Sequence, residues 1–210
     1  MSPTLDGVSP SILVPSAVVA YLIGAIPVGF FVARAFGIGD IRRHGSGTIG
    51  MTNVLRTAGK MPAVLTLIGD VVKGMLAVWL GAYVAGATPA DVPVVAVAAV
   101  IGNCWSVFLR FRGGKGVATG LGALLVLVPW AIAPSALVFL TVVATTRYVS
   151  LGSLLGAIGV PIVAFVLGYP VRPVIAALFV AIIIVLRHRE NIGRLLSGTE
   201  NRLGRRAAAP

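Results

Sequence analysis

The chain has 210 residues, of which 58% are hydrophobic and 11% charged, and its mean hydropathy is +1.01. A soluble domain carries about 25% charged residues, so this composition excludes an ordinary soluble protein and indicates membrane-spanning helices. Lys and Arg outnumber Asp and Glu by 17 to 6, but they fall in short segments between apolar runs, which argues against nucleic acid as a partner.

Seven apolar segments are expected to cross the membrane, because a transmembrane helix needs about 20 apolar residues. The first ten residues contain no Lys or Arg, so the first segment is expected to remain as a span rather than to be removed as a signal peptide. The whole chain, 1–210, is expected to form one integral-membrane domain. We place the spans at about 11–36, 61–84, 92–109, 117–129, 131–146, 151–168 and 171–187.

The number of spans depends on the segment 117–147. As one span it would place Arg147 and the basic end of the chain outside, against the rule that keeps Lys and Arg in cytoplasmic loops. As two passes of about 22 Å that turn near Pro129 and Trp130, it keeps both in the cytoplasm. The sequence therefore predicts an all-α polytopic membrane protein with about seven transmembrane helices, its N-terminus outside and its C-terminus cytoplasmic.

The first polar segment, residues 42–60, contains HGSGTIGMTN and follows the first span. Glycines allow tight turns and expose backbone N–H groups that suit phosphate oxygens, and those here are Gly45, Gly47 and Gly50. Neutral donors and one planar guanidinium accompany them: Ser46, Thr52, Asn53 and Arg56. Considered alone, the segment is equally consistent with a flexible turn that precedes an ordinary capped helix.

Asp70 and Lys73 lie three residues apart within the second span. Charged residues inside a membrane are costly and are functional candidates by default. An internal ion pair that fixes helix packing is the favoured interpretation of these two.

The second polar segment, residues 110–119, reads RFRGGKGVAT. A lysine among exposed amides at the start of a helix has the chemistry of a phosphate loop, and the residues concerned are Gly113, Gly114, Lys115 and Gly116. The spacing is not that of a Walker A motif, so nucleotide hydrolysis is not indicated. Anchoring at the membrane interface explains Arg110 and Arg112 better than it explains Lys115.

Ser150 and Ser153 follow at the cytoplasmic start of a span, where they can cap the helix or face a pocket. The third polar segment, residues 187–206, begins RHRENIGR, in which His188 and Asn191 share a helix face. Alone, this segment is best read as a basic helix end. Alternatively, His188 can act as a general base or donate a hydrogen bond to phosphate.

Few residues suit a metal or a disulfide. His44 is the only other His, Cys104 is the only Cys, and carboxylates are scarce, so we expect no metal site and no internal disulfide. The predicted topology instead brings all three polar segments to the cytoplasmic face. Together they predict a pocket for an anion there.

The motifs GSGTIGMTNVLR, FLRFRGGKGVAT and RHRENIGRLLSGTE resemble, in order and spacing, the three cytoplasmic motifs of the bacterial acyl-phosphate:glycerol-3-phosphate acyltransferase family. LIGAIPVGF, GDVVKG and RYVSLGS also fit, so the resemblance covers most of residues 21–203. It implies a seven-span enzyme of the bacterial cytoplasmic membrane, with its active site on the cytoplasmic face and with no metal or other cofactor.

The resemblance also implies the reaction. The family moves a fatty acyl group from acyl phosphate to the sn-1 hydroxyl of glycerol 3-phosphate and releases lysophosphatidate and phosphate, the first step of phospholipid synthesis. The implied partners are these two substrates, membrane lipid and a functional link to an enzyme that forms acyl phosphate. The implied polar site contains Ser46, Arg56, Lys115, Ser153, His188 and Asn191. In it, Arg56 and Lys115 would hold phosphate, while Ser46, His188 and Asn191 would position glycerol phosphate.

This sequence departs from the usual family pattern at four positions and leaves the charged residues of the motifs intact. They are Thr48 in place of Asn, Met51 in place of Ala, Asn103 in place of His and Ser106 in place of Pro. The HxxxxD motif of acyltransferases that use acyl-CoA or acyl carrier protein is absent, since Ile49 and Gly193 stand five residues after the two histidines.

Two other classes of protein are alternatives. A transporter or channel for a phosphorylated solute would use the same basic pocket, but would need a polar path that reaches both faces. An enzyme that uses a CDP-linked lipid would need a metal held by clustered Asp residues, and six scattered acids do not supply them.

Overall fold

The computed structural model describes residues 10–83, 88 and 90–204, and within these residues it contains helices and no strands. This confirms the predicted all-α class. The termini for which the sequence predicts opposite sides of the membrane, 1–9 and 205–210, lie outside the described residues, as does residue 84 at the expected end of the second span. The α-helices are α1 (Pro10–Ala25), α2 (Val28–Ala35), α3 (Met51–Ala58), α4 (Lys60–Tyr83), α5 (Val92–Cys104), α6 (Val117–Leu127), α7 (Pro129–Thr146), α8 (Val149–Val166), α9 (Val171–Arg187) and α10 (Arg189–Leu196), and two short 3-10 helices are Ile41–Arg43 and Val107–Leu109.

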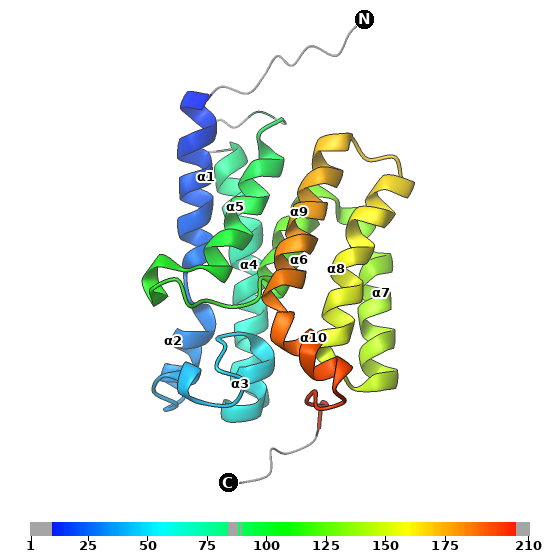
Figure 1. Cartoon of the computed structure of the whole chain (residues 1–210). Helices are drawn as coiled ribbons and strands as arrows, with labels where there is room; N and C mark the ends of the chain where they lie inside the picture. Colours follow the sequence, from blue (N-terminus) through cyan, green and yellow to red (C-terminus); the bar gives the residue numbers. More distant parts are fainter. Residues whose placement is uncertain (1–9, 84–87, 89, 205–210) are drawn as a thin grey trace, which may run out of the picture.

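The long helices lie side by side in a bundle, with α2, α3 and α10 gathered at one end (Figure 1). Among the described residues, five helical segments are long and apolar enough to cross a membrane, and a sixth results if α9 and α10, bent by 61°, form one span. A seventh would need α6, whose 11 residues measure about 16 Å, well short of a bilayer core. The count of seven therefore stays a prediction.

The segment 117–147 is broken into two helices near Pro129, where the charge pattern predicts a turn. Helix α6 ends at Leu127 and α7 begins at Pro129, so the segment 117–147 forms two helices. Proline suits the first turn of a helix because the backbone N–H that it lacks has no intrahelical partner there. The two helices meet at the opposite end of the bundle from α3 and α10 (Figure 1).

The ion pair expected within the second span is present. In α4, Lys73 Nζ lies 2.7 Å from Asp70 Oδ1, and both side chains are buried. The same ammonium donates to the carbonyl oxygen of Ile26 at 2.7 Å and to Asn103 Oδ1 at 2.9 Å. Pro27, which lacks an N–H, lies between α1 and α2, and the carbonyl of Ile26 at this break accepts from Lys73 and also from the N–H of Val28 at 3.0 Å. The pair thus joins α1, α4 and α5.

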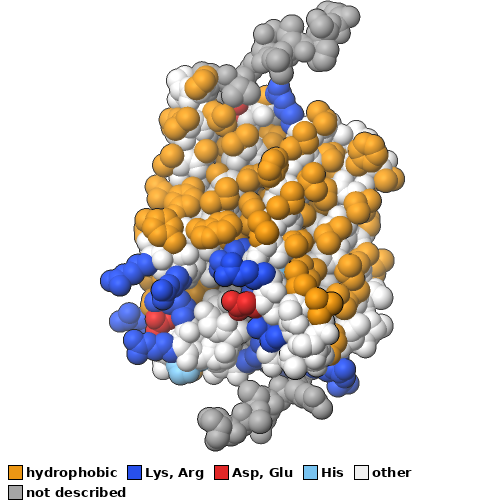
Figure 2. Space-filling view, viewed as in Figure 1, with side chains coloured by type: hydrophobic (Ala, Val, Ile, Leu, Met, Phe, Trp, Pro, Cys, Tyr) orange, Lys and Arg blue, Asp and Glu red, His pale blue; other side chains and the backbone are white. Residues whose placement is uncertain are grey.

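The bundle has a basic end, which we define as α2, α3, α10 and the segments 36–50 and 110–116. Figure 2 shows Lys and Arg gathered toward this end, whereas hydrophobic side chains cover most of the remaining surface in this view. The main hydrophobic core lies farther along the bundle and includes Val100, Leu124, Ile132, Val160 and Val180. The polar segments therefore lie at one end of the bundle, whereas the main core and most of the surface seen in Figure 2 beyond that end are apolar.

Candidate active site

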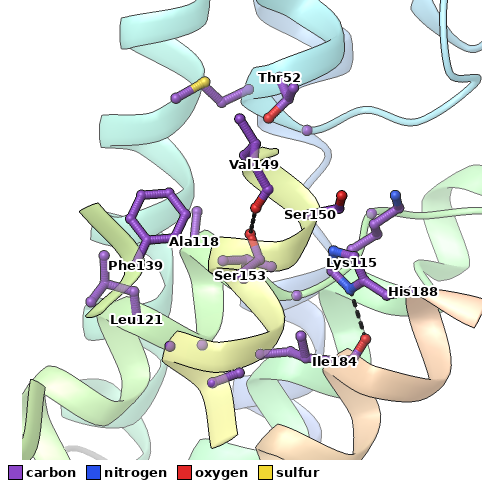
Figure 3. A pocket seen from close by; sticks show the side chains of 18 of the residues that line it. Thr52, Lys115, Ala118, Leu121, Phe139, Val149, Ser150, Ser153, Ile184 and His188 are labelled. Atoms are coloured by element: carbon purple, nitrogen blue, oxygen red, sulfur yellow. Dashed lines mark hydrogen bonds between the residues drawn. The ribbon is translucent and has the colours of Figure 1, made fainter. Parts of the chain in front are cut away.

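A cavity of about 410 Å³ opens at the basic end and extends into the bundle. Its inner walls are mostly apolar and come from α4 and α6 to α9, with Leu67, Leu121, Leu124, Ile132, Phe139, Leu140, Val160 and Val180 among the lining residues, and Asp70, Asn103 and Ser135 also line the cavity. Its outer part is polar and contains Ser46, Thr48, Thr52, Arg56, Lys115, Ser150, Ser153, His188, Asn191, Arg194 and Glu200. Figure 3 shows residues of both kinds around it, with the side chains of Lys115 and His188 close together. The cavity is therefore amphipathic along its length.

Most of the residues predicted for the site line this cavity. They are Ser46, Thr52, Arg56, Gly114, Lys115, Gly116, Ser153, His188 and Asn191. Segments far apart in the sequence are thus brought together, as expected. The structure does not place Gly45, Gly47, Asn53 or Gly113 in the cavity lining.

Asn53 organises the loop that carries Ser46. Its buried amide donates to the carbonyl oxygens of His44 at 3.0 Å and Thr48 at 2.8 Å, and its Oδ1 accepts from the N–H of Ser46 at 2.8 Å. A Cβ at Gly45 would lie 2.2 Å from Asn53 Oδ1, and the backbone there is left-handed with a φ of +58°. Gly45 and Asn53 therefore fix the conformation of this loop without lining the cavity.

The glycines of the second polar segment are also bonded within the protein. The N–H of Gly113 donates to the carbonyl of Cys104 at 3.3 Å, and that of Gly114 donates to the carbonyl of Asn103 at 2.9 Å. Both glycines are buried, and a Cβ at Gly113 would lie 2.1 Å from the oxygen of Asn103. These two amides are therefore not free to bind phosphate, contrary to the expectation of exposed amides throughout this loop.

Three helix N-termini offer other backbone N–H groups to an anion in the cavity. First-turn residues of α3, α6 and α8 line the polar part of the cavity: Met51, Thr52, Val117, Ala118, Val149 and Ser150. The first N–H groups of a helix have no intrahelical partner, and the helix dipole makes this end partly positive. Convergence of three such ends favours bound anions.

A hydrogen-bonded network joins Lys115 to the third polar segment. Lys115 Nζ donates to Asn191 Oδ1, and Asn191 Nδ2 donates to Glu200 Oε1 at 2.7 Å. Glu200 also accepts from Ser150 Oγ at 2.9 Å and Arg194 Nε at 2.7 Å. Burial raises the pKa of Glu200, but these three hydrogen bonds outweigh it and lower the pKa below its ordinary value. An ionised Glu200 thus holds Asn191 with its oxygen toward Lys115.

Glu200 and Arg194 were missed by the sequence analysis. Glu200 is 8% exposed although it belongs to a strongly basic, polar tail. The available signal was that it is one of only 6 acidic residues and stands within a motif that fits the family pattern.

His188 lies between α9 and α10, and its Nδ1 is 2.8 Å from the carbonyl oxygen of Ile184. A carbonyl only accepts, so Nδ1 carries the hydrogen and a neutral imidazole would keep its lone pair on Nε2. Ser153 similarly donates its hydroxyl hydrogen to the carbonyl of Val149 at 2.8 Å, as drawn in Figure 3. Ser153 is thus left as an acceptor toward the cavity.

Three of the departures from the family pattern have hydrogen-bond partners. Asn103 accepts from Lys73, and Ser106 Oγ donates to the carbonyl of Ala25 at 2.6 Å. Thr48 Oγ1 lies 3.2 Å from Ser46 Oγ at the mouth of the cavity. Met51 lines the cavity and packs against the buried cluster that includes Ile49 and Val54.

Activity is expected to fall above about pH 8, because burial lowers the pKa of Lys115 to about 8. The nearby Arg194 and Arg56 lower this pKa further, while Glu200 and Glu190 oppose them. Above that pH the ammonium loses its proton, and with it the positive charge that attracts phosphate. The measurement is kcat/KM from pH 6 to 10.

Lys115→Arg is the control for this pH dependence. A guanidinium stays charged throughout the range, so the alkaline limb should move out of it even if the rate is lower. An unchanged limb in Lys115→Arg would show that another group titrates.

Among the described residues, no group of three His, Cys, Asp or Glu side chains is arranged to hold a metal ion.

Comparison with known proteins places this chain in a family. The family model described as glycerol-3-phosphate acyltransferase matches residues 14–198. The chain belongs to this family.

Named members of the glycerol-3-phosphate acyltransferase family are similar over nearly their whole length. The protein of that name from Syntrophotalea carbinolica is 50% identical over 184 residues, which cover 87% of this chain and 93% of the relative. That from Geobacter sulfurreducens is 46% identical over 186 residues, with 88% and 94% covered.

Solved structures of PlsY (YgiH), an integral membrane glycerol 3-phosphate acyltransferase, share the fold. Its glycerol 3-phosphate form superposes with a TM-score of 0.85 at 38% identity and covers 91% of this chain and 96% of its own. Its lysophosphatidic acid form gives a TM-score of 0.83 over 91% and 95%. The chain is accordingly an integral membrane protein with the fold of an acyltransferase.

Proposed function

We propose that this protein transfers a fatty acyl group from acyl phosphate to the sn-1 hydroxyl of glycerol 3-phosphate and releases lysophosphatidate and phosphate. The observation that supports it best is the amphipathic cavity, whose anion-binding outer part continues into apolar walls. An acyl phosphate has the same two parts, a charged head and a hydrocarbon tail. The relatives act on glycerol 3-phosphate by name, and a lysophosphatidic acid form of one has been solved.

The chemistry asks mainly for positioning and charge neutralisation. The sn-1 oxygen attacks the acyl carbonyl carbon, the bond from that carbon to the phosphate oxygen breaks, and the phosphate leaves. The hydroxyl hydrogen ends on the released phosphate, so no net proton is consumed. An acyl phosphate is an activated anhydride, and holding it beside the acceptor supplies most of what the reaction needs.

The site residues divide this work. Arg56 and Lys115 hold phosphate oxygens, assisted by the N-terminal amides of α3, α6 and α8. Arg56 has no carboxylate within ion-pair distance among the described residues, so its guanidinium is available. His188, Asn191 and Ser46 orient the glycerol hydroxyl, with His188 Nε2 as the acceptor of its hydrogen bond.

A transporter for a phosphorylated solute fits the cavity less well. A transported anion needs a polar path to both faces of the membrane. Here the inner part of the cavity is lined by buried apolar side chains of the main core, including Leu124, Ile132 and Val160, which do not favour the passage of an anion.

The direct test uses the purified protein with palmitoyl phosphate and glycerol 3-phosphate, following lysophosphatidate by mass spectrometry. We expect turnover with acyl phosphate and none with palmitoyl-CoA alone. Efficient turnover with palmitoyl-CoA would refute the donor, and no product from either donor would refute the acyltransferase.

We further propose that the protein lies in the bacterial cytoplasmic membrane with the basic end facing the cytoplasm. This orientation follows the positive-inside rule, with seven spans and one catalytic domain over 1–210. The donor must then come from an enzyme class that forms acyl phosphate at or near that face.

Labelling of single cysteines tests this topology. In a Cys104→Ser background, a cysteine at Ala90 should react with an impermeant maleimide added to intact spheroplasts. Cysteines at Arg147 and Ser197 should react only after lysis. Labelling of both Ala90 and Ser197 from outside would overturn the count of seven, and labelling of Ser197 but not Ala90 from outside would reverse the orientation.

A further inference from the structure

Arg187, the last residue of α9, bonds to the loop that carries Lys115. Its Nε donates to the carbonyl of Gly114 at 3.1 Å, and its Nη2 donates to the carbonyl of Gly113 at 3.4 Å. The guanidinium carbon lies 5.4 Å from the centre of the Trp105 ring. Arg187 does not line the cavity, so its two-pronged contact is made with the protein rather than with a ligand.

The opposite side of the same loop is held by the end of α5. The N–H groups of Gly113 and Gly114 donate to the carbonyls of Cys104 and Asn103. Both N–H groups and both carbonyls of these buried glycines are therefore bonded within the protein. Peptide bonds are planar, so fixing these two residues fixes where the chain leaves them, at Lys115.

The support extends behind α5 to the buried ion pair. Lys73 of that pair donates to the side chain of Asn103, whose carbonyl accepts from Gly114. The loop is thus held between α5, which α4 braces, and Arg187 of α9.

We propose that Arg187 is a positioning residue for the acyl transfer, which sets the loop at Gly113 and Gly114 so that Lys115 and the first amides of α6 face the phosphate. The inference depends on the proposed function, because it assigns to Lys115 the phosphate of that reaction. Arginine suits the role because its planar fork meets two successive carbonyls while its face lies against an indole. Lysine keeps the charge but offers one compact ammonium.

The test compares Arg187→Gln, Arg187→Lys and the control Arg189→Gln in purified protein. Arg189 is exposed, carries the same charge and lies two residues away, and no hydrogen bond of its side chain is found among the described residues. We expect kcat/KM to fall about 10- to 100-fold in Arg187→Gln, because a shift of about 1 Å in a positioned group has an effect of that order. Arg187→Lys should recover part of the loss, and Arg189→Gln should match the wild type.

The pH profile separates positioning from a merely structural role. If the loop is loosened, Lys115 becomes more exposed to solvent, and the alkaline limb of kcat/KM should move to higher pH in Arg187→Lys. Because this variant keeps the positive charge at position 187, a lost charge there cannot be the cause of the shift. If Arg187→Gln does not purify as a folded protein, Arg187→Lys carries the test.

Two results would overturn the proposal. The first is a rate within 3-fold of wild type in both Arg187 variants, and the second is a reduced rate with the wild-type alkaline limb in Arg187→Lys. A wild-type protein that makes no lysophosphatidate would instead refute the proposed function, so the two failures are distinguishable.

Discussion

Replacing Lys115 with Ala is expected to lower kcat/KM about 10- to 150-fold, and replacing Arg56 with Ala is expected to do the same. Each side chain comes from a different polar segment and reaches the same cavity. A hydrogen bond to a charged group is worth about 1.5–3 kcal/mol, and each 1.36 kcal/mol is a factor of about ten in rate. Both residues lie at the polar mouth, so the variants should stay folded and inserted.

The measurement is kcat/KM at acyl phosphate concentrations below KM, with folding checked by size-exclusion chromatography. Arg112→Ala is the control, because Arg112 is exposed and does not line the cavity. Near-normal turnover by both Arg56→Ala and Lys115→Ala would show that GSGTIGMTNVLR is only a connection between helices.

Replacing Glu200 with Ala is expected to lower both stability and activity strongly. The change removes the acceptor of three hydrogen bonds, from Ser150, Asn191 and Arg194. Breaking a largely buried ion pair and leaving its donors unsatisfied costs about 3 kcal/mol. Asn191 also loses the contact that turns its oxygen toward Lys115, so kcat/KM should fall by at least about 10-fold.

Glu200→Gln should have a smaller effect and separates the two roles of the carboxylate. Its carbonyl oxygen still accepts from Ser150 and Asn191, but its amide would face the donor Arg194 Nε. Thermal unfolding and kcat/KM are measured together, with the exposed Glu190→Gln as the control. A Glu200→Ala protein with wild-type melting and turnover would remove Glu200 from the site.

The helices and the break between α6 and α7 could be predicted because they depend on local properties. Apolar length and the position of charges indicate where helices lie, and Pro129 marks a helix start that the structure contains. The count of spans could not be settled in the same way. Helix α6 has 11 residues, and whether such a segment crosses a membrane depends on its neighbours.

The sequence indicates which residue types gather at the cavity, but not which of their groups face it. A run such as Gly113-Gly114-Lys115 indicates phosphate chemistry, but it does not tell which peptide groups face the cavity. In the structure the amides of both glycines bond to α5, which follows from the position of α5 rather than from the run itself.

Glu200 and Arg187 could not be predicted for a related reason. Glu200 meets Ser150, which lies 50 residues earlier in the chain, and Arg187 meets Gly114, which lies 73 residues earlier. In the sequence both belong to a basic tail that is typical of a solvated surface. Only the folded chain shows that their partners are nearby.

The wall of the cavity at Leu140 has a consequence for how the reaction rate is controlled. Leu140 of α7 lines the cavity and is 60% exposed, so the apolar part of the cavity is open at this helix. We expect an acyl donor dissolved in the bilayer to enter the site from the side here, without crossing water. The quantity that saturates the enzyme is then the mole fraction of donor among the surrounding lipids. Adding inert phospholipid at a fixed total amount of donor lowers the mole fraction of donor in the membrane around the enzyme. Catalysis should then slow, although the aqueous phase is unchanged.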